Sequence, residues 1–148
     1  IARGLCGDPH LAQDLTQQAL EKAYLKWGRV RRAEEPFAYV RRILVNVHHD
    51  RQRHRPWREQ PTAYAQDADL TTASAADGHV ADREAVRRAL AELTPRERAV
   101  VVLRFGDDLS EADTARELGV AVGTVKSACA RALGKLRATP QLDGVQEA

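Results

Sequence analysis

Cysteine, methionine and aromatic residues are scarce in this chain of 148 residues, which contains two Cys, no Met, two Trp, three Tyr and two Phe. Cys6 and Cys129 are far apart and neither belongs to a Cys-x-x-Cys pair, which argues against a disulfide framework or a zinc finger and favours reduced thiols in a cytoplasm. No apolar run approaches the roughly 20 residues of a membrane helix, and no signal peptide is visible. Because the chain begins at Ile1, we expect it to lack its native N-terminus.

Charge is distributed unevenly along the chain, although the formal net charge is only +2. Residues 59–81 contain acidic residues but no Lys or Arg, whereas residues 119–137 contain Lys and Arg but no acidic residue. Hydrophobic residues make up 43% of the chain, and few of them are aromatic. This composition is typical of helical bundles with aliphatic cores.

Two helices are predicted in the N-terminal third, because apolar residues recur there at spacings of three and four. In the first, from Asp8 to Trp27, the stripe expected to be buried is Leu11, Ala12, Leu15, Ala19, Ala23 and Trp27. In the second, from Pro36 to His54, it is Val40, Ile43, Leu44 and Val47. Gly28 is expected to end the first helix, and Pro36 suits the first turn of the second.

A second helical unit is predicted after a linker. Residues 56–80 contain two prolines, small residues and acids without periodicity, so we expect a flexible linker at 57–79. Four helices should follow, with N-caps at Thr94 and Ser110, over residues 81–92, 95–106, 110–118 and 121–137. The predicted fold class is therefore all-α, with two small helical domains at 1–56 and 80–138 and a tail at 139–148. We expect the two domains to fold separately and to move relative to one another.

The C-terminal domain contains the spacing of a helix-turn-helix. Ala115 allows two helices to cross closely, Gly119 suits a turn residue with positive φ, and Val125 closes the pair. On the helix 121–137, the stripe expected to be buried is Val125, Cys129, Ala132, Leu133 and Leu136. The opposite face is basic with little bulk, and comprises Lys126, Ser127, Ala130, Arg131, Gly134 and Lys135. Such a face allows close approach to the major groove of DNA, although a solvated surface helix has the same pattern.

The helix from Pro36 to His54 carries a second face compatible with DNA. Opposite its apolar stripe, one side of the helix presents Tyr39, Arg42, Asn46, His49 and Arg53. Cations, an amide and an aromatic ring suit unpaired DNA, where phosphates are neutralised and exposed bases stack. A solvated cationic face is the alternative.

Two polar clusters in the sequence are candidates for a catalytic or metal site. His48, His49, Asp50 and His54 lie close in sequence, but adjacent helical residues point about 100° apart, so we expect no metal site. The acidic residues at 107–113 surround a helix start, where they complement the helix dipole. With no glycine-rich phosphate loop and no nucleophile motif, no catalytic residue and no cofactor are expected.

Two sequence blocks, "LTPRERAVVVLRF" and "SEADTARELGVAVGTVKSACARALGKLR", resemble the C-terminal domain (region 4) of extracytoplasmic-function, or group 4, sigma factors of bacterial RNA polymerase. "DPHLAQDLTQQALEKAY" and "PFAYVRRILVNVHHDRQR" resemble the N-terminal domain (region 2). The sequence of the helix-turn-helix is similar to that of the SigE family of actinobacteria. The resemblance covers all but the linker and the tail, and it implies a further helix before Ile1.

The resemblance implies three sets of site residues. The −35 element would face Thr124, Lys126, Ser127, Ala130, Arg131 and Lys135. The melted −10 element would lie beside the loop 29–35 and the helix after it, at Arg31, Arg32, Phe37, Tyr39, Arg42, Asn46, His49 and Arg53. The clamp helices of the polymerase would contact Asp14, Gln17, Gln18, Glu21 and Leu25.

The implied function is that of a non-enzymatic sigma factor in the cytoplasm, associated with the nucleoid. It would bind core RNA polymerase at the clamp helices and the flap, direct it to promoter DNA and help to melt it. An anti-sigma factor is a further candidate partner, and no membrane is involved. One alternative is a helix-turn-helix regulator that acts without polymerase docking, which would leave the face on helix 36–54 unexplained. A third class of function is that of a metal-dependent nuclease.

Overall fold

The computed structural model describes residues 1–54 and 78–138, and every regular element within them is helical. The N-terminal segment contains α1 (Ala2–Cys6), α2 (Pro9–Leu25), α3 (Trp27–Val30) and α4 (Pro36–His54). The C-terminal segment contains α5 (Gly78–Ala91), α6 (Pro95–Val101), the π-helical turn η1 (Val102–Gly106), α7 (Glu111–Leu118) and α8 (Val122–Arg137). The all-α fold class is confirmed. The tail and nearly all of the expected linker lie outside the described residues.

Helix starts follow the capping residues in the sequence. The Asp8 carboxylate accepts hydrogen bonds from the backbone N–H groups of His10 (2.7 Å) and Leu11 (3.0 Å), and so caps α2. Thr94 caps α6 in a capping box with Glu97, and Ser110 accepts from the N–H of Asp113 at the start of α7. These side chains satisfy donors that a helix start otherwise leaves unpaired, and both N-caps expected from the sequence are confirmed.

The core of the N-terminal segment lies between α2 and α4, which pack along their apolar stripes. Its centre contains Ala12, Leu15, Ala19, Ala23, Ile43, Leu44 and Val47, all buried. Trp27 was expected to join them, but it is 58% exposed. The reason is a break at Lys26 (φ −107°, ψ 19°), which ends α2 and begins α3, so that Trp27 leaves the α2 stripe.

Three elements were not predicted. The helix α1 has only five residues, and α3 has four and contains Gly28, which was expected to end a helix. Such short elements show no complete hydrophobic period. The expected helix 95–106 changes to π-helical geometry at η1, and Asp108 just beyond it has a left-handed φ of 52°.

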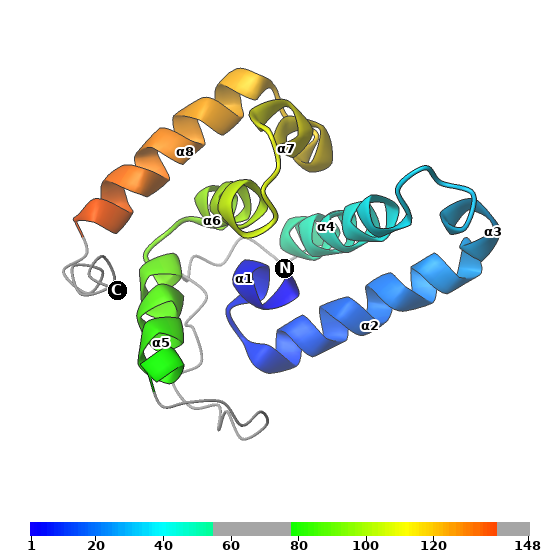
Figure 1. The fold of residues 1–148 in the computed structure, drawn as a ribbon, viewed down its shortest axis with the longest axis horizontal. Coiled ribbons are helices and arrows are strands. Elements are labelled where there is room, and N and C mark those ends of the chain that lie inside the picture. Colours follow the sequence, from blue (N-terminus) through cyan, green and yellow to red (C-terminus); the bar gives the residue numbers. More distant parts are fainter. Residues whose placement is uncertain (55–77, 139–148) are drawn as a thin grey trace.

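The two segments share one apolar core in the structure. Leu5 and Cys6 of α1 belong to the same buried cluster as Ala99, Val102 and Leu103 of α6 and η1. Figure 1 shows α1 and α4 lying between α2 and the C-terminal helices. We expected two domains that move relative to one another, because the linker offers few apolar anchors. In the structure α1 supplies apolar contacts between the two segments, and their independent folding and relative movement stay a prediction.

Replacing Gly4 with valine should separate the two segments. A Cβ atom at Gly4 would lie 2.8 Å from Cγ2 of Val102 across the interface, closer than real contacts allow. We expect helix content to be kept, because each segment retains its own buried residues, and the radius of gyration from small-angle scattering to increase. Gly28→Val is the control, since a Cβ at Gly28 meets nothing within 4 Å. Equal radii for the two variants would count against a close interface.

His48 should make folding sensitive to acid. Its side chain lines a cavity of about 260 Å³ together with Cys6 and Arg98. Burial, followed by the positive charge of Arg98, lowers the pKa of His48 from 6.5 to about 4. Below pH 6.5 the unfolded chain therefore binds a proton that the folded protein does not, and the free energy of unfolding should fall by about 2 kcal/mol by about pH 5.

The measurement is urea unfolding as a function of pH. His48→Gln should flatten the profile between pH 6.5 and 4, because it removes the group that titrates differently in the two states. The control is His49→Gln, which makes the same substitution at the exposed neighbouring position of α4. A wild-type slope in His48→Gln would contradict the assignment.

Candidate nucleic-acid interface

The turn between α7 and α8 has the geometry expected of a helix-turn-helix. Gly119 ends α7 with a left-handed φ of 64°, which glycine adopts without steric cost. The N–H of Val120 then donates to the carbonyl of Ala115 (3.0 Å), and three residues separate the end of α7 from the start of α8. Ala121 is the N-cap of α8 and makes no side-chain hydrogen bond there. The predicted turn is confirmed.

Close packing holds α8 against α6 and α7. Val125 and Ala128 are fully buried and form one cluster with Val100 and Ala115. The sequence placed Cys129 in the buried stripe and left Ala128 out of it, whereas Cys129 is half-buried and packs against the cluster's edge. The reason is that α6 covers the flank of α8 that carries Ala128, which the period of one helix does not reveal.

The outer face of α8 is basic, and small side chains lie between its basic residues. Its exposed residues include Lys126, Ser127, Ala130, Arg131 and Lys135, as predicted, whereas Thr124 is half-buried. The Ser127 hydroxyl donates to the carbonyl of Thr124 (3.1 Å), so it does not project far from the helix. The arrangement brings cations and small side chains together on a surface that a groove of DNA can approach.

Carboxylates on neighbouring helices contact this basic face. Lys126 lies 3.7 Å from a carboxylate oxygen of Glu111 at the start of α7. On the other flank, Arg131 (3.6 Å) and Lys135 (2.8 Å) both reach Glu97, whose side chain is only 5% exposed. The sequence contained the capping-box spacing Thr94-x-x-Glu97, but nothing in it showed that Glu97 lies under α8.

The outer face of α4 is also exposed over most of its length. The exposed residues of the predicted set are Arg31 and Arg32, which follow α3, and Phe37, Arg42, Asn46, His49 and Arg53. Phe37 is 66% exposed, which suits stacking on a base. Tyr39 is half-buried and packs against the core, so less of its ring is accessible.

Arg41, which is not among the residues predicted from the sequence, links α4 to the C-terminal segment. Its guanidinium donates to Asp107 (2.9 Å) and lies 3.9 Å from Glu117 on α7. Burial raises the pKa of Glu117, although the charges of Arg41 and Arg42 oppose the increase. Acidic side chains of the C-terminal segment therefore lie next to the N-terminal half of α4.

The outer face of α2 combines polar side chains with one large apolar residue. All five predicted polymerase contacts are exposed, namely Asp14, Gln17, Gln18, Glu21 and Leu25. Leu25 is 83% exposed, and a large apolar side chain exposed to solvent suits a contact with a protein partner. Asp14 has one ion pair in the described residues, with Arg51 at 3.9 Å.

The described residues contain no group of three or more His, Cys, Asp and Glu side chains that could hold a metal ion. In the cluster of His48, His49, Asp50 and His54, His48 is buried while His49 and Asp50 are exposed, and the side chain of His54 lies outside the described set. Within the same residues, no helix has the length and hydropathy to cross a membrane.

Comparison with known proteins matches both segments to one family. Residues 1–58 match the family described as Sigma-70 region 2, and residues 83–136 match Sigma-70, region 4. The chain is 40% identical over 136 residues to the RNA polymerase sigma-E factor of Streptomyces avermitilis, covering 92% of this chain and 74% of the relative. The chain belongs to the sigma-70 family. It is an extracytoplasmic-function RNA polymerase sigma factor, and its function is promoter recognition.

Other relatives agree with this sigma-factor family. The chain is 40% identical over 129 residues to the ECF RNA polymerase sigma factor SigM of Mycobacterium tuberculosis, covering 84% of this chain and 62% of the relative. A solved structure of the sigma factor RpoE in complex with the anti-sigma factor NepR from Bartonella quintana has the same fold, with a TM-score of 0.70 and 24% identity. That similarity covers 96% of this chain and 88% of the RpoE chain.

Proposed function

We propose that the outer face of α8 recognises the −35 promoter element in the major groove. The observation that carries this proposal is the exposed basic face itself, held outward by the buried contacts of Val125 and Ala128. Its contact residues are Thr124, Lys126, Ser127, Ala130 and Arg131. Lysine and arginine neutralise phosphates, and arginine can also read guanine with two hydrogen bonds. Because the other side chains are small, part of the readout depends on DNA shape.

The second DNA contact is the outer face of α4, beside the melted −10 element. Phe37, which is 66% exposed, stacks on an unpaired base. Asn46 contacts base edges, and the phosphates are held by Arg31, Arg32, Arg42, His49 and Arg53. Tyr39 supports this face from a half-buried position.

The third contact is the outer face of α2, which docks on the clamp helices of core RNA polymerase. Leu25 supplies an apolar anchor among the polar residues Asp14, Gln17, Gln18 and Glu21. The C-terminal segment docks on the flap of the other large subunit. In this proposal the sigma factor works in the cytoplasm at the nucleoid, has no chemistry of its own and, like the Bartonella relative, takes an anti-sigma factor as partner.

Arg131→Ala should weaken binding to promoter DNA by about 1–3 kcal/mol and relax the preference at one base of the −35 element, because a bidentate contact to guanine is lost. The measurement is fluorescence anisotropy with promoter DNA and scrambled DNA of equal length over a series of salt concentrations. Arg88→Ala on α5 is the control, since Arg88 is also exposed and also pairs with a glutamate. If Arg131→Ala changes neither the affinity nor the salt dependence, the basic face of α8 is only solvated.

A further inference from the structure

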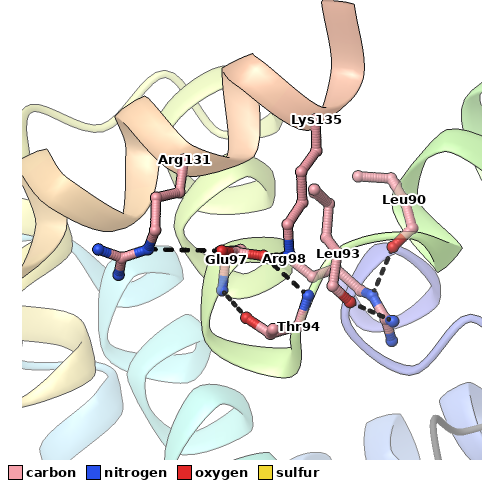
Figure 2. Close-up of polar contacts among 7 residues, drawn as sticks. All are labelled: Leu90, Leu93, Thr94, Glu97, Arg98, Arg131 and Lys135. Carbon is pink, nitrogen blue, oxygen red and sulfur yellow. Dashed lines mark hydrogen bonds and ion pairs between the residues drawn. The ribbon is translucent and has the colours of Figure 1, made fainter. Parts of the chain in front are cut away.

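Glu97 is a buried carboxylate that contacts α8, the helix proposed to face DNA, on the side of α6. It lies in the first turn of α6 and is 4% exposed. Its Oε2 accepts hydrogen bonds from the backbone N–H of Thr94 (3.0 Å) and from Nζ of Lys135 (2.8 Å), while Oε1 lies 3.6 Å from Nε of Arg131. Figure 2 shows Arg131 and Lys135 descending from α8 to this one carboxylate.

The capping of α6 does not account for this arrangement. A capping box needs one acceptor at the third helical position, and a neutral glutamine can provide it. Glu97 instead carries a charge beneath α8, where two basic residues one helical turn apart reach it. Burial raises the pKa of Glu97, but the hydrogen bonds from Lys135 and Thr94 outweigh burial and hold the pKa below its ordinary value. The carboxylate is therefore ionised at neutral pH.

The contact with Arg131 leaves one end of the guanidinium available. Glu97 faces Nε, and Figure 2 shows the two terminal nitrogens of Arg131 on the side away from the carboxylate. The Arg131 side chain is 59% exposed, so these nitrogens lie at the surface. Two parallel N–H donors are the group that pairs with O6 and N7 of guanine. An arginine held in this way loses less conformational freedom when it binds.

We propose that Glu97 is a positioning residue for promoter recognition, which orients Arg131 toward a base and withholds Lys135 from the DNA phosphates. The proposal rests on the proposed contact between α8 and the −35 element. It changes the expected role of Lys135, from a DNA contact to a tether between α8 and α6. The negative charge of Glu97 lowers the affinity for DNA of any sequence, whereas the orientation of Arg131 favours only the −35 element, so the ratio of specific to non-specific affinity rises.

Glu97→Gln tests this role, because glutamine keeps the capping acceptor and the shape of the side chain but removes the charge. The assay uses the whole chain with −35 duplex and scrambled duplex over a series of salt concentrations. We expect the ratio of specific to scrambled affinity to fall roughly twofold to tenfold, since Arg131 is no longer pre-oriented. The salt slope on scrambled DNA should steepen by about one, since Lys135 becomes available to a phosphate.

Two further variants separate this role from a structural one. Thr94→Ala weakens the same capping box but keeps the charge of Glu97, so stability should fall while the affinity ratio stays at the wild-type value. In the wild-type background, Lys135→Gln should leave the salt slope unchanged. In the Glu97→Gln background, it should return the salt slope to the wild-type value. The result for Lys135→Gln in the wild-type background remains decisive even if Glu97→Gln folds poorly, because it needs no change at Glu97.

The results that would overturn the proposal differ from those that would overturn the −35 contact. If Arg131→Ala weakens promoter binding while Glu97→Gln changes neither the affinity ratio nor the salt slope, Glu97 only caps α6 and the positioning role fails. If Lys135→Gln alone makes the salt slope shallower by about one, Lys135 contacts phosphate and is not withheld. If Arg131→Ala changes binding to neither duplex, the −35 contact itself fails.

Discussion

Ala128→Asp should unfold the C-terminal helices, whereas Ala130→Asp should leave them folded. Ala128 is fully buried against α6, in the cluster that contains Val100 and Val125. An aspartate there would be a buried charge without a partner, which costs more than about 3 kcal/mol. Ala130 lies two residues further along the same helix and is exposed. Both variants lose the same helix propensity, so the difference between them isolates burial.

The measurement is thermal and urea unfolding of both variants, followed by circular dichroism. Ala130→Asp should keep a midpoint near that of the wild type while losing affinity for DNA, because it places a negative charge on the face proposed to meet phosphates. Equal midpoints for the two variants would show that α8 is rotated from the orientation described above, and the proposed −35 residues would then be misassigned.

Leu15→Ala should destabilise the N-terminal segment by about 2–5 kcal/mol, the usual cost of removing a buried leucine and leaving a cavity. Leu15 is fully buried between α2 and α4. Leu25 provides a matched control on the same helix, because it is 83% exposed and Leu25→Ala should change stability by less than about 0.5 kcal/mol. Urea unfolding gives both values.

The two leucines also separate stability from docking. Leu25→Ala should weaken binding to core polymerase in a pull-down or by surface plasmon resonance, while its unfolding curve stays that of the wild type. A loss of stability in Leu25→Ala equal to that in Leu15→Ala would mean that the outer face of α2 is part of the folded core and not a free surface.

Local signals were sufficient to predict much of the fold. The bounds of α4 follow from Pro36 and an apolar period, and the starts of α6 and α7 follow from Thr94 and Ser110, because caps and periodicity act within a few residues. Gly119 was identified in the same way, since the turn requires a positive φ. The exposed faces of α2, α4 and α8 then follow as the opposite sides of their buried stripes.

Contacts between distant residues were not predictable in this way. The burial of Ala128 depends on α6, and the shared core depends on the five residues of α1. Glu97 and Lys135 are 38 positions apart, so no spacing rule for a single helix relates them. Arg41 and Asp107 are 66 positions apart and join the two segments. Each of these features arises when helices that are separately predictable pack together.

The alternative of a helix-turn-helix regulator that acts without polymerase leaves the N-terminal segment unexplained. Residues 1–58 match sigma-70 region 2, and the exposed faces of α2 and α4 lie within that match. A regulator of that kind has no need of an apolar anchor such as Leu25 on the face of α2 that carries Asp14.

The most direct test is run-off transcription by core RNA polymerase supplied with this protein and a library of genomic promoters. The account predicts transcripts from a defined set of promoters with the wild-type protein. It also predicts their loss with Asp14→Arg, which reverses a charge on the polymerase face, and with Ala130→Asp on the DNA face, although both variants remain folded. The account would be contradicted if the protein bound these promoters without polymerase and Asp14→Arg left transcription unchanged.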